Sequence, residues 1–281
     1  MAEKATGGGR LSGKIALIVG GAGGIGSGIV EDFVKEGARV VVADIAAEKA
    51  EDLAENINRR YGEGKAVAVH VDVTDETSVQ EMVEKTLEIF GEIDILIYCV
   101  GVVKAGSVKS YSLSDFKFVT DANYTGYFLC VKHVSRVMAE QHKQDPSRIM
   151  DIIQINSKSG LQGSNRNFAY AGSKFGGIGL TQSFALELIE DGIKVNAVCP
   201  GNVFDGPLWS DPKNGLFVQY LKAGKVPGAK TVEDVRRYYE SKIPMGRGCT
   251  VKDILTAIYY LIEQQYETGQ AILVAGGQIM K

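Results

Sequence analysis

The chain alternates short apolar runs with longer stretches of helical periodicity, and this alternation limits the folds open to it. The apolar runs are expected to be strands and occupy residues 14–19, 39–43, 66–71, 93–100, 148–155, 193–199 and 271–274. They are nearly continuous in apolar residues, which indicates strands buried on both faces. Helices are expected between them, from the first glycine cluster to residue 36 and over residues 48–61, 76–90, 113–140, 170–190 and 251–263.

Strands buried on both faces and joined through helices form a parallel sheet with right-handed crossovers. The pattern therefore predicts an α/β fold, a doubly wound, Rossmann-type parallel sheet of about seven strands with helices on both faces. A single domain is expected over residues 11–281, and the Gly-rich, polar residues 1–10 are expected to form a disordered arm.

Residues 201–244 interrupt the alternation of strands and helices and contain no run that is typical of a strand. Long irregular insertions in compact domains are often lids or binding loops, so we expect a small cap over a pocket. The segment is rich in aromatic residues, namely Phe204, Trp209, Phe217, Tyr220, Tyr238 and Tyr239. These side chains could equally form a satellite hydrophobic cluster or a subunit contact.

Composition narrows the class of protein. A net charge of −3 and a pI near 5.8 argue against nucleic acid as a partner. The chain has no apolar run of membrane-spanning length and no signal peptide core at its start, so a cytoplasmic protein without a membrane partner is expected. The four cysteines are far apart, and the three histidines lack ligand-like spacing, so no metal site is expected.

A glycine cluster follows the first expected strand and precedes the first helix. Gly20, Gly24 and Gly26 have the spacing G-x-x-x-G-x-G, with Gly23 and Ile25 between them. Glycines allow a tight turn and a close approach of the backbone to a pyrophosphate, and the helix N-terminus offers free N–H groups. This context predicts a dinucleotide site.

Two further strand ends carry a carboxylate. Asp44, followed by Ile45, closes the second strand, where it could accept hydrogen bonds from the adenosine ribose and repel a 2′-phosphate. NAD is therefore expected as cofactor rather than NADP. Asp44 could alternatively be a helix N-cap. Asp72 and Val73 close the third strand and are expected beside the adenine.

Tyr170 and Lys174 are four residues apart on an expected helix, and Ser157 follows the fifth strand. Positions i and i+4 share a helix face, so an ammonium could favour the anionic form of the phenol, which titrates near pH 10 by itself. Ser157 could hold a substrate oxygen beside the Tyr170 hydroxyl. The same spacing also occurs on ordinary amphipathic helices, where the aromatic ring is buried and the lysine is solvated.

Taken together, these motifs resemble the short-chain dehydrogenases/reductases. The resemblance rests on the glycine cluster and on Asp72-Val73, Asn123, Ser157, Tyr170-x3-Lys174 and Pro200-Gly201, in the family's order. It implies that Tyr170 is the acid/base, that Ser157 polarises the reacting oxygen and that Lys174 binds the nicotinamide ribose and lowers the Tyr170 pKa. Asn123 would anchor a proton-relay water. It also implies cofactor contacts from Val100, Gly101, Pro200, Gly201, Asn202 and Val203, and a homotetramer.

Two positions depart from the family pattern. The Thr that usually precedes the first glycine is Val19, and the usual Asn-Asn-Ala-Gly at the end of the fourth strand is Tyr98-Cys99-Val100-Gly101. A side-chain hydrogen bond near the turn and the asparagine support of the neighbouring backbone are therefore missing. The four catalytic positions, Asn123, Ser157, Tyr170 and Lys174, all match the family pattern.

Several segments, including 152–160, 126–130, 174–183 and the ending 276–280, resemble family members that act on polyol phosphates. This likeness implies NAD-dependent oxidation of C2 of D-sorbitol 6-phosphate to D-fructose 6-phosphate. A phosphate needs a cation, and Lys104 and Lys158 are the candidates, with Arg166 and Lys213 more remote. Asn156, Ser159 and Asn202 add polar groups suited to a polyol. Two alternatives remain. The enzyme could act on another polyol or sugar phosphate, or the chain could be a non-catalytic NAD-binding regulator.

Overall fold

The computed structural model describes residues 9–280, and a single parallel sheet runs through them. Its spatial order is β3-β2-β1-β4-β5-β6-β7. The strands are β1 (Ile15–Val19), β2 (Arg39–Asp44), β3 (Ala66–His70), β4 (Ile95–Tyr98), β5 (Met150–Ile155), β6 (Ile193–Pro200) and β7 (Ala271–Val274). Because every neighbouring pair is parallel, all seven carboxyl ends lie at one edge, and the predicted doubly wound fold is confirmed.

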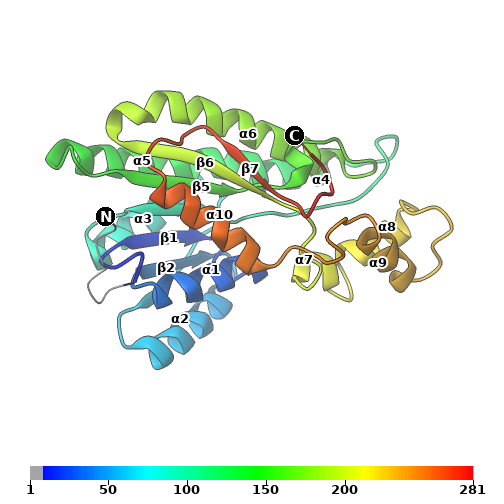
Figure 1. Cartoon of the computed structure of the whole chain (residues 1–281), viewed down its shortest axis with the longest axis horizontal. Coiled ribbons are helices and arrows are strands. Elements are labelled where there is room, and N and C mark those ends of the chain that lie inside the picture. The colour runs from blue at the N-terminus through cyan, green and yellow to red at the C-terminus, as the bar shows by residue number, and fades with distance from the viewer. Residues whose placement is uncertain (1–8, 281) are drawn as a thin grey trace.

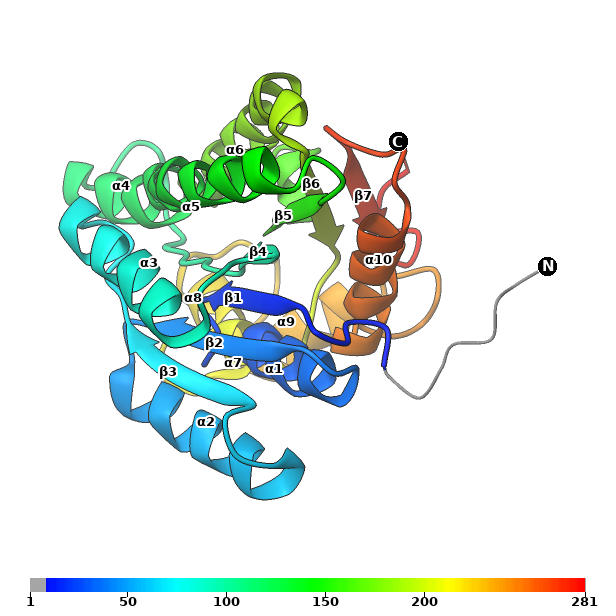
Figure 2. The ribbon, with the colours of Figure 1, turned by 90° about the vertical axis from the view of Figure 1, so that its left-hand side faces the viewer.

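Helices cover both faces of this sheet (Figure 2). One side carries α1 (Gly24–Lys35), α2 (Ala47–Tyr61) and α10 (Val251–Glu263), and the other carries α3 (Glu76–Phe90), α5 (Gly126–Gln144) and α6 (Phe168–Leu188). The short turns η2 (Lys158–Gly160) and η3 (Ile189–Asp191) flank α6. Among residues 9–280, no helix combines the length and apolar character needed to cross a bilayer.

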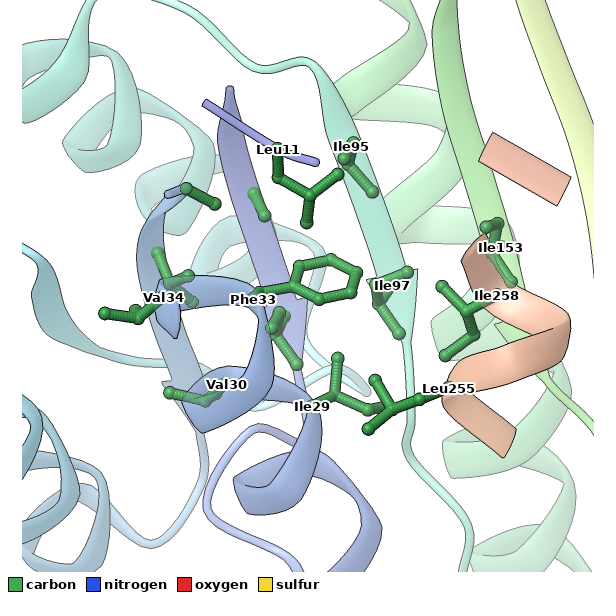
Figure 3. Close-up of a cluster of buried hydrophobic side chains, with 14 of the residues drawn as sticks. Leu11, Ile29, Val30, Phe33, Val34, Ile95, Ile97, Ile153, Leu255 and Ile258 are labelled. Atoms are coloured by element: carbon green, nitrogen blue, oxygen red, sulfur yellow. The ribbon is translucent and has the colours of Figure 1, made fainter. Parts of the chain in front are cut away.

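The core lies between the sheet and each helical layer. Figure 3 shows side chains of α1, β4 and α10 meeting in one such cluster, including Ile29, Phe33, Ile97 and Leu255. All four of these side chains are buried. Burial of each such side chain contributes about 1.5–3 kcal/mol, so this layer fixes α1, and with it the glycine turn, against the sheet.

The helix expected over residues 113–140 is present and extends to Gln144, but it is not α-helical throughout. The segment is divided into α4 (Leu113–Thr120), the π-helical turn η1 (Asp121–Thr125) and α5. Tertiary hydrogen bonds explain the interruption: the Tyr98 hydroxyl donates to the carbonyl oxygen of Ala122, and the Asn123 side chain bonds both backbone groups of Val102. Such turns are often found at functional sites.

The segment 201–244, for which a cap was expected, folds into short helices and loops and is called the cap below. It contains α7 (Pro207–Ser210), α8 (Leu216–Lys222) and α9 (Val232–Glu240), and Figure 1 shows α8 and α9 projecting beyond one end of the sheet. Phe204, Trp209, Phe217 and Tyr220 are buried in one hydrophobic cluster, with Tyr238 and Tyr239 packed on it. The cap is therefore held together by its own aromatic core.

The arm expected over residues 1–10 falls largely on residues 1–8, which lie outside the described residues. Arg10, its last residue, is anchored: its side chain pairs with Glu263 at 2.6 Å and lies 3.9 Å from the ring centroid of Tyr259. Leu11 follows in the core, with 1% of its surface exposed. The stacking and the ion pair thus hold Arg10 against α10.

Candidate active site

A cavity of about 510 Å³ opens at the carboxyl edge of the sheet. Residues at the ends of four strands line it: Gly20 after β1, Cys99 after β4, Ile155 in β5 and Pro200 in β6. Residues of α7, α8 and the loops of the cap complete its wall. The carboxyl edge of a doubly wound sheet is where such folds bind ligands.

The glycine turn forms a cradle in which side chains have no room. Gly20 has a φ of +79°, and a Cβ on Gly26 would lie 2.1 Å from the Gly20 carbonyl oxygen. The backbone at the start of α1 is thereby exposed to the cavity, and no side chain caps that helix. This cradle fits a pyrophosphate, which free N–H groups and the helix dipole would stabilise. A Cβ on Gly24 would lie 2.6 Å from Cδ of Pro207, so the cap touches the turn.

Asp44 and Asp72 lie at adjacent strand ends beside this turn. The Asp44 carboxylate accepts hydrogen bonds of 3.0 Å from the backbone N–H groups of Ala22, in the glycine turn, and of Ala46. Helix α2 begins after Ala46 without a side-chain cap, so Asp44 braces the turn instead of capping the helix. Asp72 accepts hydrogen bonds from Thr74. Neither aspartate lines the cavity itself.

Tyr170 and Ser157 face the cavity from two different elements. Tyr170 lies in the first turn of α6, which starts at Phe168, two residues before the expected start. Ser157 follows β5 and its Oγ accepts a hydrogen bond of 3.0 Å from the N–H of Ser159. Burial raises the pKa of Tyr170 to about 12, and hydrogen bonding to Ser157 acts in the opposite direction.

Lys174 lies one helical turn after Tyr170 and is 1% exposed. Its Nζ donates to the carbonyl oxygen of Ile155 at 3.1 Å and lies 5.7 Å from the Tyr170 ring centroid. Burial lowers the pKa of Lys174 to about 8. Burial is the largest influence on the pKa of Tyr170. The lowering of that pKa by Lys174, which the family resemblance implies, stays a prediction.

Asn123 is fully buried behind this pair. Its Oδ1 accepts from the N–H of Val102 at 2.8 Å, and its Nδ2 donates to the Val102 carbonyl and to Oγ of Ser173. Asn123 therefore connects the loop after β4 to the residue that precedes Lys174. It does not line the cavity.

The cavity brings most of the expected site residues together. Those that line it are Gly20, Gly23, Gly24, Ile25, Gly26, Gly101, Ser157, Lys158, Ser159, Tyr170, Lys174, Pro200, Gly201, Asn202 and Val203. Those expected at the site that do not line it are Asp44, Ile45, Asp72, Val73, Val100, Lys104 and Asn123. The Lys104 ammonium lies 5.7 Å from the Phe118 ring centroid, and Arg166 and Lys213 are also outside the lining.

Several residues that the sequence did not indicate also line the cavity, among them Asn167, Lys225 and Lys242. Asn167 directly precedes α6, whereas the two lysines belong to the cap. No local motif marks the lysines, and only the expectation of a cap over the pocket pointed to their neighbourhood. Two buried amide atoms of the cavity lining, Asn167 Oδ1 and Asn202 Nδ2, have no hydrogen-bond partner within the described chain.

Comparisons with known proteins agree with this geometry. The short chain dehydrogenase family profile matches residues 14–210. Sorbitol-6-phosphate 2-dehydrogenase of Escherichia coli K12 is 39% identical over 270 residues, with 95% of this chain and 99% of that protein covered.

Solved structures show the same relationship. The sorbitol-6-phosphate 2-dehydrogenase SrlD of Erwinia amylovora is 39% identical, with a TM-score of 0.86 and coverage of 95% of this chain and 100% of that one. An NAD⁺-bound xylitol dehydrogenase is 28% identical, with a TM-score of 0.87 and the same coverage. The family and this NAD⁺-bound relative support a nicotinamide cofactor, and the glycine cradle fits one. The chain belongs to the short-chain dehydrogenases, a family of oxidoreductases.

Proposed function

We propose that the chain oxidises C2 of D-sorbitol 6-phosphate to D-fructose 6-phosphate, and catalyses the reverse reduction, with NAD as cofactor. The observation that carries this proposal is the convergence of Ser157, Tyr170 and Lys174 with the glycine cradle in one cavity. Similarity to sorbitol-6-phosphate 2-dehydrogenases over 95% of the chain supports the choice of substrate.

The chain supplies the proton transfer and the positioning. Tyr170, as phenolate, takes the proton of the substrate hydroxyl, and Ser157 holds the same oxygen. Lys174 keeps positive charge next to the phenolate, and Asn123 holds the loop after β4 in place. A nicotinamide cofactor held by the glycine cradle would supply the hydride acceptor for C2, and the balanced products would be the ketone, the reduced cofactor and one proton.

NAD is proposed over NADP because of Asp44. Its carboxylate is fixed at the carboxyl end of β2 by the N–H groups of Ala22 and Ala46. A fixed negative charge there accepts hydrogen bonds from ribose hydroxyls and repels a 2′-phosphate.

A substrate panel tests the proposal. NADH formation is followed with D-sorbitol 6-phosphate and with D-sorbitol, and NADH consumption with D-fructose 6-phosphate, each repeated with the NADP couple. We expect turnover of both phosphorylated compounds with the NAD couple. Turnover of D-sorbitol but of neither phosphorylated compound would indicate that the substrate is a free polyol. No turnover with any of these substrates would contradict the proposed function.

A further inference from the structure

The cap side of the cavity carries three lysines from three separate segments. Lys158 lies in η2 beside Ser157, Lys225 lies in the loop between α8 and α9, and Lys242 follows α9. All three line the same cavity as Tyr170. Two of them belong to the cap and one to the catalytic side, so the positive charge gathers where the cap meets the rest of the domain.

No carboxylate offsets this charge. The described residues that line the cavity include no Asp or Glu. Within residues 9–280, the lysines that pair with a carboxylate are others: Lys14, Lys35, Lys132, Lys143 and Lys194. Lys225 instead donates to Ser164 Oγ at 3.0 Å and lies 3.9 Å from the Tyr220 ring centroid. Lys242 contacts the ring and hydroxyl of Tyr238.

The charge of Lys242 acts on both of the other lysines. Burial, and then the charge of Lys242, lower the pKa of Lys158. Burial, followed by the charges of Lys158 and Lys242, lowers the pKa of Lys225 to about 8. Like charges gathered without a counter-ion destabilise the site, and a bound dianion would relieve that repulsion.

Asn167 gives an independent sign of a polar ligand. Its side chain lines the cavity and is 3% exposed, and its Nδ2 donates to the Tyr220 hydroxyl at 3.2 Å. Its Oδ1 has no partner within the described chain. A buried amide oxygen without a partner is unfavourable, and a hydroxyl donor from a ligand would remove that penalty.

We propose that Lys225 and Lys242 of the cap, together with Lys158, form the phosphate subsite of this cavity, and that Asn167 accepts a hydrogen bond from a hydroxyl of the same ligand. The inference rests on the proposed function in that the phosphate and the oxidised carbon belong to one substrate. Phosphate binding then also ties the cap to the catalytic side of the domain.

The kinetic test uses Lys225→Gln, Lys242→Gln and the double variant. The KM for D-sorbitol 6-phosphate should rise about tenfold to hundredfold for each single variant, because each loses a charged hydrogen bond to phosphate. The ratio of kcat/KM for D-sorbitol 6-phosphate to that for D-sorbitol should fall by a similar factor. Lys225→Arg keeps the charge and should recover most of the affinity. Lys222→Gln, at the exposed end of α8, is the matched control and should keep the wild-type KM.

A binding test needs no turnover. Inorganic phosphate, added with saturating NADH so that the pyrophosphate site is filled, should raise the melting temperature of the wild-type protein and of Lys222→Gln. The rise should be much smaller in the double variant. Equal rises in all three proteins, or unchanged KM values in both single variants, would overturn the phosphate subsite. If phosphate binds through the lysines but D-sorbitol 6-phosphate is not oxidised, the proposed substrate fails and the subsite stands.

Discussion

The Lys174 ammonium donates a 3.1 Å hydrogen bond to the carbonyl oxygen of Ile155, the last residue of β5. This bond joins the helix that carries Tyr170 to the strand that leads into Ser157. Keeping a cation in this position has a cost, since burial lowers the pKa of Lys174 to about 8.

Lys174→Met should therefore raise the stability of the folded chain and lower its activity. In wild-type protein below about pH 8, Lys174 is charged while buried, and its folded-state pKa lies below the unfolded value of 10.5. Removing it should stabilise the cofactor-free chain at pH 7 by up to about 3 kcal/mol. The gain should shrink as the pH rises from 8 towards 10.5. Turnover should fall at least about hundredfold. Urea denaturation at pH 7 and pH 9.5 measures the gain, and a less stable variant at pH 7 would contradict the argument.

Tyr98→Phe should lower both stability and turnover. The variant loses the hydrogen bond from Tyr98 to the Ala122 carbonyl, which holds the π-helical turn around Asn123. We expect a loss of about 1–3 kcal/mol in unfolding free energy and a reduced kcat. Tyr127→Phe is the matched control, because that buried hydroxyl pairs with the Thr181 hydroxyl at 3.1 Å and not with the backbone of the turn. Equal kcat values for the two variants would rule out positioning by Tyr98.

Asp44→Ala should relax the choice of cofactor. Removing the fixed carboxylate removes both the ribose acceptor and the repulsion of a 2′-phosphate, so the NAD-to-NADP ratio of kcat/KM should fall about tenfold or more. Asp75→Ala is a suitable control, because Asp75 caps α3 and its carboxylate likewise accepts a backbone N–H. An unaltered ratio in Asp44→Ala would show that this carboxylate does not select the cofactor.

The preference for a phosphorylated substrate should depend on pH. Lys225 faces the charges of Lys158 and Lys242, and its pKa is lowered to about 8, so its ammonium is lost as the pH rises above that value. A sugar phosphate is a dianion above about pH 6. The ratio of kcat/KM for D-sorbitol 6-phosphate to that for D-sorbitol should thus be highest between about pH 6 and pH 8 and should fall above about pH 8. A ratio that keeps rising up to pH 10 would exclude Lys225 from phosphate binding.

Much of the fold follows from local pattern. Apolar runs of strand length and the glycine turn after the first of them are local signals, and they predicted the strands, the parallel sheet and the place of the cofactor cradle. The spacing of Ser157, Tyr170 and Lys174 works in the same way, because a strand end and one helical turn fix their relative positions.

The sequence did not predict features that depend on contacts between residues far apart in the chain. The π-helical turn depends on Tyr98 and Val102, which no periodicity within residues 113–140 reveals. Lys104 is near Gly101 in sequence, but its side chain reaches Phe118 instead of the cavity. Lys225 and Lys242 are brought to the cavity by the packing of the cap around Trp209, and a tertiary aromatic core leaves no short motif in the sequence.

The most direct measurement is the initial rate of NADH formation from D-sorbitol 6-phosphate by wild-type protein and by Tyr170→Phe, with NADH binding measured in parallel. We expect measurable turnover by the wild type, a loss of at least about hundredfold in the variant, and NADH affinity within about threefold of wild type. Turnover by Tyr170→Phe at the wild-type rate would contradict the assignment of Tyr170 as the acid/base.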